Sequence, residues 1–414
     1  MGTWVGELVF GRYRVLHRMA GGGMAEVYLA QQESLPGAER YVILKSPRLD
    51  AARQLTRVAR FLDEARVAAQ LNHPNVVALL EAGAWKNATW IAMEHVHGVD
   101  VGEIMVAAVR EQQRLPVLLV AHVLMQAAEG LQHAHTAVDR WGKPLRVVHR
   151  DVSPQNLMVR SDGLVKVLDF GVARADNRVE QTQGEAIRGR LAYLSPEMIL
   201  GTGVDGRADQ FALGVVGWEM CANRRLFMAD SQDETLHRVA TGAVPSLAEV
   251  APETPAALVE IITRMLQRDP AARFPDCAAV AHALRGFILG LTRAPVQPIV
   301  AAYVQESLGA TLEERARVAT ESAAAVVRAA EAARFAQEAG TDTDVNVQDD
   351  TTAVLSEEAQ GTIRFEEETD GFGEEQTTLN LGGDVEAALS GRGVTTRSGK
   401  VVPLDGKKGG SRKG

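Results

Sequence analysis

Short hydrophobic runs separated by turn-forming residues characterise the first ninety positions of the chain. Runs rich in Val, Leu, Ile and Tyr occupy residues 13–16, 26–29 and 41–44, and three consecutive glycines separate the first run from the second. Apolar runs of this length, bounded by glycine, are typical of β-strands joined by hairpins. The pattern therefore predicts a small β-rich unit at the beginning of the chain.

The periodicity changes to that of helices after about residue 120. Apolar residues recur there at intervals of three and four positions, at Val120, Leu124, Ala127, Leu131 and Ala134. This spacing places them on one face of a helix. Residues 213–220 and 258–266 predict two further buried helices. The expected fold class is α+β, with a small β-rich lobe before a larger helical lobe.

Composition and charge exclude several classes of protein. The 414 residues are 46% hydrophobic, so the chain can bury a large core and is not disordered throughout. Lys and Arg total 44 against 53 Asp and Glu, and the net charge of −9 argues against a dedicated nucleic-acid-binding protein. Two cysteines, Cys221 and Cys277, provide no disulfide framework and indicate a reducing compartment.

Targeting and membrane-spanning segments are not evident. The first ten residues include Glu7 and lack the basic and then apolar profile of a signal peptide. The most apolar long stretch, residues 286–304, contains Arg293, Pro295 and Pro298. A membrane helix needs about eighteen or more uninterrupted apolar residues. We therefore expect a cytoplasmic protein without a membrane span.

The C-terminal third differs in composition from the rest. Residues 291–340 combine a linker with a segment rich in Ala, Glu and Arg, for which a solvated or marginal helix is favoured over a coiled coil. Residues 341–380 contain twelve acids and one base, whereas residues 391–414 contain seven bases and one acid. Such a segment cannot offset its ordering entropy, so residues 341–414 are predicted to be a disordered tail, acidic and then basic.

Candidate catalytic groups lie in the middle of the chain. Asp151 is followed by Asn156 and, thirteen residues later, by Asp169. Phosphoryl transfer to a hydroxyl needs a carboxylate that orients the nucleophile and takes its proton, which Asp151 can supply. It also needs hard oxygen ligands for Mg²⁺, which Asn156 and Asp169 can supply. The glycines near residue 22 can approach a phosphate chain closely, although such a cluster alone is more often a plain turn.

These motifs together resemble the bacterial serine/threonine protein kinases of the eukaryotic type. The matching segments are His149-Arg150-Asp151, Asp169-Phe170-Gly171, Ser195-Pro196-Glu197 and the pair Asp209 and Arg273. The resemblance implies a two-lobed kinase fold in which Glu197 pairs with Arg273 and buried Asp209 braces the catalytic loop. It also implies ATP and Mg²⁺ as cofactors, with Asp151 and Lys45 as catalytic residues and Asn156 and Asp169 as metal ligands.

The same resemblance implies a set of nucleotide contacts. They are Ala20, Gly21, Gly22, Gly23 and Val27 in the glycine-rich loop, Lys45 and its partner Glu64, the hinge residues Glu94 and Val96, the ribose-contacting Asp100, and Met158. Met93 is expected to be the gatekeeper residue that precedes the hinge.

Four positions depart from the family pattern. Ala20 and Ala25 replace two loop glycines, and Ile43 replaces an alanine at the roof of the adenine pocket, which should narrow that pocket. Ser153 replaces the lysine that neutralises charge on the transferred phosphoryl group, and the loss of one such donor can cost on the order of 10²–10³ in turnover.

Arg190 stands where these kinases usually carry threonine near the catalytic aspartate. A charge lost at Ser153 and gained at Arg190 suggests an exchange of roles, in which a guanidinium replaces the ammonium near the γ-phosphate. The alternative is that Arg190 points to solvent. We therefore include Arg190 with Asp151 and Lys45 among the predicted catalytic residues.

The predicted function is ATP-dependent phosphorylation of serine and threonine hydroxyls on protein substrates, including autophosphorylation. The alternatives are a pseudokinase scaffold and a protein that acts mainly through its tail. The predicted domains are a kinase domain at residues 10–290, divided at about residue 95, then residues 291–340 and the tail. Threonines in the tail predict autophosphorylation sites that a phosphothreonine-reading partner recognises.

Overall fold

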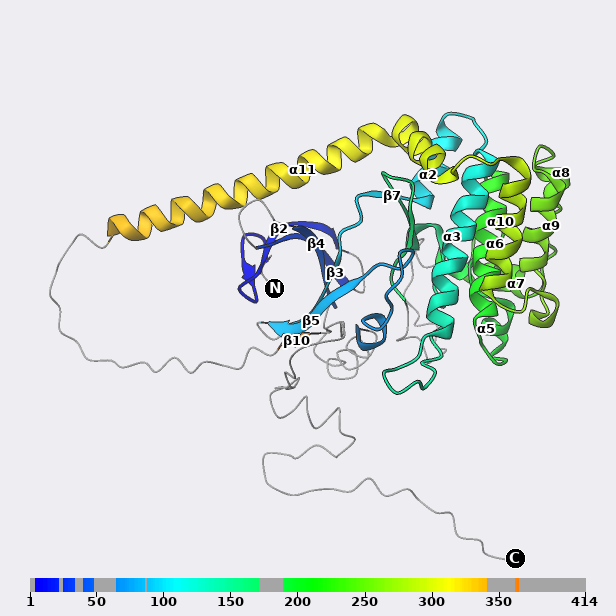
Figure 1. Cartoon of the computed structure of the whole chain (residues 1–414), viewed down its shortest axis with the longest axis horizontal. Helices are drawn as coiled ribbons and strands as arrows, with labels where there is room; N and C mark the ends of the chain where they lie inside the picture. The colour runs from blue at the N-terminus through cyan, green and yellow to red at the C-terminus, as the bar shows by residue number, and fades with distance from the viewer. Residues whose placement is uncertain are drawn as a thin grey trace, which may run out of the picture.

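The computed structural model describes residues 4–21, 25–33, 40–47, 65–85, 88–170, 189–340 and 362–364. A β-rich lobe and a helical lobe lie side by side, and one long helix, α11, extends from the helical lobe along the β-rich lobe (Figure 1). The predicted α+β fold with two lobes is therefore confirmed.

The small lobe is built on an antiparallel sheet. Its strands occur in the order β1-β2-β3-β4-β6-β5-β10. Their bounds are β1 Leu8–Val9, β2 Tyr13–Gly21, β3 Ala25–Gln32, β4 Arg40–Pro47, β5 Leu79–Trp85, β6 Ala88–Glu94 and β10 Thr362–Arg364. The three apolar runs in the first fifty residues thus form β2, β3 and β4, as their pattern predicted.

The alternation of side chains along β4 gives this sheet two different faces. Val42 and Leu44 are buried in an aromatic core that includes Tyr28 and Trp90. Because successive side chains of a strand point to opposite faces, Ile43 and Lys45 lie on the other face. The second face therefore bears Lys45, the lysine that the sequence predicts to be catalytic.

The large lobe is a helical bundle with one continuous apolar core. Trp218 and Phe211 on α6 are almost fully buried within it. The helices are α2 Val101–Arg110, α3 Val117–Thr136, α5 Pro196–Leu200, α6 Arg207–Ala222, α7 Gln232–Thr241, α8 Leu247–Val250, α9 Ala256–Met265 and α10 Cys277–Leu291. The predicted helices after residue 120, at 213–220 and at 258–266 correspond to α3, α6 and α9.

A second, three-stranded sheet lies between the lobes. It consists of β7 Gly98–Asp100, β8 Leu157–Arg160 and β9 Val165–Val167, paired in that order. A single 3₁₀ turn, η1 Pro154–Asn156, leads directly into β8. This small sheet fixes the segments on either side of it, residues 149–156 and 168–170, against the large lobe.

The C-terminal third differs from the sequence prediction in two respects. Helix α11 spans Val296–Gly340, and its first residues join the core of the large lobe, where Val300 and Val304 are fully buried. The helix therefore begins within the expected linker, whereas most described side chains of its Ala, Glu and Arg-rich part are exposed or half-buried, apart from Leu312, Ala319 and Val326. Residues 362–364 form β10, which pairs with β5, whereas disorder was predicted throughout 341–414. The other residues of that tail lie outside the described part of the chain.

Within the described residues, no single helix has both the length and the apolar composition needed to cross a membrane. Helices α10 and α11, which meet at a bend of 83°, meet the length and composition criteria only when they are taken together.

Candidate active site

The catalytic loop is held in place by a buried carboxylate. Both oxygens of Asp209 accept backbone N–H groups, from His149 and Arg150 at 2.8 Å each, and the ring of His135 lies 2.7 Å from Asp209 Oδ2. Burial opposes ionisation of this carboxyl, but the bonds to His135 and to the backbone of Arg150 hold its pKa below the ordinary value. Asp209 thus braces the loop, as the sequence predicted.

His149 connects the catalytic loop to the segment that bears Asp169. Its Nε2 lies 2.7 Å from the carbonyl oxygen of Leu168, and its ring packs 4.7 Å from that of Phe170. Two backbone positions beside these contacts have positive φ angles, +62° at Arg150 and +49° at Asp169. Non-glycine residues rarely adopt this conformation, and such strain concentrates at functional sites, where the surrounding structure holds it.

Asp151 lies at the centre of a polar cluster. The amide of Asn156 donates to the backbone oxygen of Asp151 at 2.7 Å, which fixes the two side chains next to each other. Arg190 donates from Nη1 to Asp151 Oδ2 at 3.2 Å, although its side chain remains 49% exposed. Arg190 therefore reaches the carboxylate and does not simply point to solvent. Ser153, by contrast, is buried and only 3% exposed.

Lys45 brings the small lobe into contact with the same site. Its Nζ lies 2.8 Å from Oδ1 of Asp169. Partial burial of Asp169 opposes its ionisation, but the charge and hydrogen bond of Lys45, with a smaller effect of Arg190, hold the pKa of its carboxyl below the ordinary value. An ionised Asp169 beside Lys45 forms a site that can bind both a phosphate and a cation.

The strand pairs show which side chains surround Lys45. Val27 lies directly opposite Lys45 in β3, while Leu29 and Met93 lie opposite Ile43 in β3 and β6. Residues directly opposite each other in neighbouring strands share a face of the sheet. An apolar surface made by Val27, Ile43 and Met93 thus continues from Lys45 toward the hinge, which is suitable for a planar apolar base.

The sequence that supplies this lysine, the two carboxylates and the amide matches a known protein family. The family model described as protein kinase domain matches residues 13–284. The chain belongs to the protein kinase family.

The kinase resembles several curated bacterial relatives. "Tyrosine-protein kinase MasK" of Myxococcus xanthus is 37% identical over 279 residues, which cover 67% of this chain and 43% of that relative. "Serine/threonine-protein kinase PknJ" of Mycobacterium tuberculosis is 32% identical over 290 residues, which cover 68% and 46%. The kinase thus spans less than half the length of these relatives.

A solved structure agrees with the fold. The crystal structure of the Mycobacterium tuberculosis PknI kinase domain superposes with a TM-score of 0.51 at 30% identity, covering 69% of this chain and 99% of that chain. Protein kinases as a family use ATP and divalent metal ions and act on protein substrates. The relatives support the resemblance on which the sequence prediction relied.

The predicted nucleotide contacts are only partly within the described residues. Ala20 and Gly21 end β2, whereas Gly22, Gly23 and Glu64 lie outside the described part of the chain. The expected pair between Lys45 and Glu64 therefore stays a prediction.

The hinge side of the site contains the remaining predicted contacts. Glu94 ends β6, Val96 is buried in the following segment, and Met158 on β8 pairs with Asp100 on β7. Asp100 has a structural task, because its side chain accepts the N–H of Glu103 at 2.9 Å and caps α2. Burial raises the pKa of this carboxyl. A ribose contact by Asp100 stays a prediction.

Lys166 is a residue of this region that the sequence did not single out. Its Nζ is buried and lies 2.7 Å from Oε2 of Glu94 and 3.3 Å from the carbonyl oxygen of Val76. The pair connects the beginning of the hinge to β9, two residues before Leu168. A lysine between two valines gives no indication in the sequence that its charge is buried.

A buried ion pair stabilises the large lobe beside the catalytic loop. Arg273 binds Glu197 through two hydrogen bonds, Nη1 to Oε1 at 2.8 Å and Nη2 to Oε2 at 2.9 Å. Arg273 also donates to the backbone oxygens of Gln267, Arg268 and Arg207. The predicted pairing of Glu197 with Arg273 is therefore confirmed.

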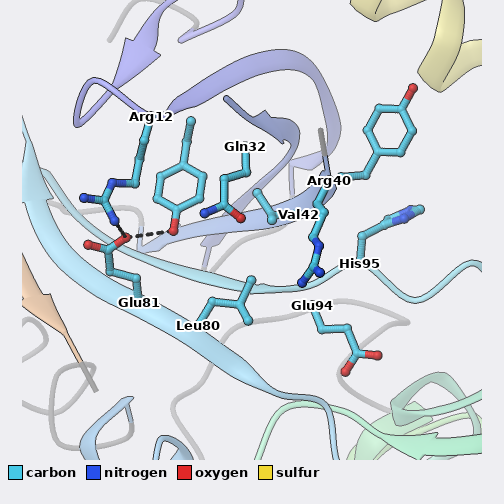
Figure 2. Close-up of a pocket in the computed structure, with 10 residues that line it drawn as sticks. Arg12, Gln32, Arg40, Val42, Leu80, Glu81, Glu94 and His95 are labelled. Atoms are coloured by element: carbon cyan, nitrogen blue, oxygen red, sulfur yellow. Dashed lines mark hydrogen bonds and ion pairs between the residues drawn. The ribbon is translucent and has the colours of Figure 1, made fainter. Parts of the chain in front are cut away.

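A hollow of about 640 Å³ opens elsewhere on the small lobe, near the hinge. Arg12 and the hydroxyl of Tyr13 both donate to the carboxylate of Glu81 within it, at 3.4 and 2.7 Å (Figure 2). Burial and the contact with Glu81 raise the pKa of Tyr13. The lining residues include Glu94 of the hinge but neither Lys45 nor Asp151, so this hollow does not contain the proposed catalytic groups.

Proposed function

We propose that the chain is an active protein kinase that transfers the γ-phosphoryl group of ATP to serine and threonine hydroxyls of proteins, including its own. The observation that carries this proposal is the contact between Arg190 and Asp151. It supplies a positive charge beside the catalytic aspartate, where Ser153 provides none. The guanidinium of Arg190, 3.2 Å from the carboxylate of Asp151, thus takes the place of the lysine ammonium that Ser153 lacks.

Asp151 is the residue that orients the substrate hydroxyl and accepts its proton. A carboxylate that already accepts from Arg190 and lies beside Asn156 is held in one position, so little reorganisation is needed during transfer. Arg190 then stabilises the charge that develops on the phosphoryl oxygens. Lys45 holds the phosphates of the nucleotide from the opposite side, next to Asp169.

Asn156 and Asp169 fit the requirements of a magnesium site. Both offer side-chain oxygens, which Mg²⁺ prefers, and the carboxyl of Asp169 has a lowered pKa and is ionised at neutral pH. When bound, the ion neutralises charge on the phosphates and lowers the cost of their approach to Asp151. The nucleotide itself is proposed to contact Ala20 to Gly23, Val27, Lys45, Glu64, Glu94, Val96, Asp100 and Met158.

The deciding experiment measures phosphate incorporation. The purified full chain is incubated with Mg²⁺ and radiolabelled ATP, and phosphoamino acids are identified, with Asp151→Asn as the matched control. We expect phosphoserine and phosphothreonine with the native chain and none above background with Asp151→Asn. No incorporation by the native chain would favour the pseudokinase alternative, and phosphotyrosine alone would assign the specificity named for MasK.

The tail supplies a further proposal about partners. Its threonines are proposed to be autophosphorylated and then bound by an arginine-bearing phosphothreonine reader, since phosphate adds charge and acceptor oxygens. Phosphopeptide mapping tests this directly, because phosphate confined to residues before 300 would refute it. The cytoplasmic location stays a prediction.

A further inference from the structure

Helix α11 begins as part of the large lobe. Val300, Val304 and Leu312 are at most 3% exposed and belong to its main core. A Cβ atom at Gly163 would lie only 2.2 Å from the carbonyl oxygen of Gln297, so the first turn of the helix packs directly on the turn between β8 and β9. The helix is therefore fixed to the large lobe at its N-terminal end.

Beyond Leu312 the same helix crosses the segment that follows the hinge. Arg315 donates from Nη1 to the carbonyl oxygen of Gly98 at 2.6 Å and also pairs with Glu103. The other carboxylate oxygen of Glu103 accepts the N–H of Asp100 at 3.0 Å. Arg315 thus contacts the residues that hold Asp100, the proposed ribose contact.

The next turns of α11 pack on the small lobe. Ala319 and Val326 are 4% and 8% exposed, and they form one apolar cluster with Leu16 and Leu29. Tyr41, Ile43 and Ala323 pack against this cluster. Figure 1 shows α11 running beside β2 and β4, in agreement with these contacts.

The sheet face that α11 covers is the one that bears Lys45. Leu29 and Ile43 are paired across β3 and β4, and Val27 and Lys45 form the next pair on the same face. Two residues along a strand correspond to about 7 Å, so the covered cluster begins one adenine ring away from the catalytic lysine. Ile43 also occupies the position that forms the roof of the adenine pocket.

We propose that the part of α11 after residue 313 is a cis-acting cover of the nucleotide cleft, and that its docking competes with binding of the adenine nucleotide. The inference rests on the nucleotide site of the proposed function. The docked helix covers Ile43, contacts the backbone of Gly98 and engages the cap that holds Asp100, so it lies against two positions, 43 and 100, of the proposed nucleotide site. Ile43 in place of alanine acquires a second purpose, since its larger side chain adds apolar surface to the docking cluster.

The contacts that hold the cover against the small lobe are weak enough for it to be released. Its docking residues are small, because Ala319, Ala323 and Val326 offer far less apolar surface than leucines would. Residues 296–313 stay in the core of the large lobe, so the part of α11 after residue 313 can leave the small lobe without unfolding the kinase. Competition is reciprocal, so release of the helix tightens nucleotide binding and nucleotide loosens the helix by the same factor.

Paired substitutions on the full chain test the cover. Val326→Glu introduces a charge into the docked face, whereas Val327→Glu places the same charge on the adjacent residue, which is 45% exposed. The dissociation constant of a fluorescent ADP analogue with Mg²⁺ is measured for both. We expect Val326→Glu to bind it at least tenfold more tightly than the native chain, and Val327→Glu to bind it within twofold.

Equal or weaker binding by Val326→Glu, or no binding by any form, overturns the proposal. Hydrogen exchange of the native chain provides a measurement without substitution. Added MgADP should accelerate exchange in residues 316–330, and slower or unchanged exchange there also overturns the cover. A chain that behaves as expected in both measurements but incorporates no phosphate would refute the proposed activity and leave the cover established.

Discussion

The contact between Arg190 and Asp151 makes the proposed catalytic role of an exposed side chain testable. We predict that Arg190→Ala lowers kcat by about 10²–10³, because a donor that stabilises transition-state charge is lost. Arg190→Lys should retain part of the activity, since a point charge replaces the planar fork. Steady-state kinetics measure both, with Arg160→Ala on the exposed pair with Asp162 as a control that changes nothing.

The exchange of roles between positions 153 and 190 can be tested by reversing it. Ser153→Lys in the Arg190→Ala background should recover at least tenfold of the lost turnover, because it restores a positive charge near the phosphoryl group. Turnover of Arg190→Ala close to that of the native chain would contradict the role of Arg190 altogether.

Asp209 contributes to stability in a pH-dependent way. Its pKa in the folded chain lies below the ordinary value of 3.8, so its ionised form stabilises the fold above that pH. This contribution is lost as the pH falls through the lowered pKa. We predict that Asp209→Asn lowers the free energy of unfolding by about 3 kcal/mol at pH 7, because an amide cannot accept from all three donors. Urea unfolding of the native chain and of Asp209→Asn should show a smaller difference in the free energy of unfolding below pH 3.8 than at pH 7.

The elements of the two lobes differ in how well the sequence predicted them. Strands β2 to β4 and helices α3, α6 and α9 follow from periodicity, because each buries one face or lies wholly in a core. Helix α11 begins earlier than the Ala, Glu and Arg-rich helix that the sequence predicted, at Val296, and Pro298 lies in its first turn, where proline is tolerated. The small residues Ala319 and Val326, seven positions apart, give no indication of which surface they cover.

The proposed catalytic residues have a clearer signature in the sequence than the face of α11 that packs on the small lobe. Asp151, Asn156 and Asp169 occur at spacings that the chemistry restricts, and Glu197 and Arg273 are distant in sequence but recognisable by family. The contact of Arg190 with Asp151 could only be raised as a hypothesis, because a side chain that is 49% exposed is not constrained by packing. The buried pair of Lys166 with Glu94 could not be predicted from the pattern of apolar and polar residues in the sequence.

The buried pair of Glu197 and Arg273 contributes far more than its surface counterparts. We predict that Arg273→Ala lowers the free energy of unfolding by about 3–5 kcal/mol, because it leaves Glu197 charged and buried without a partner. Arg317→Ala, which removes the exposed pairs with Glu314 and Glu321, should leave the free energy of unfolding almost unchanged. Similar losses in the two variants, measured by chemical denaturation, would contradict this account of the pair.

For the whole molecule, the proposed cover divides α11 into residues 296–313, which belong to the large lobe, and a part after residue 313 that can be released. A chain that ends at residue 295 loses Val300, Val304 and Leu312, and we predict that its free energy of unfolding falls by about 5 kcal/mol, since each is almost fully buried. A chain that ends at residue 313 keeps all three and should unfold within a few degrees of the full chain. Thermal unfolding compares them, and equal melting temperatures for the two truncations would contradict the division.

The length of α11 also limits where the tail can reach. From Arg315, which touches Gly98 beside the hinge, to Gly340 the helix extends for about 37 Å. Chain beyond Gly340 covers at most about 3.6 Å per residue, so Thr341 and Thr343 cannot return to Asp151 of the same molecule while the helix is intact. Threonines some thirty residues further on are not limited in this way. The rigid helix before the tail therefore predicts that the nearest of the proposed acceptor threonines are phosphorylated by a second molecule, at a rate that depends on protein concentration.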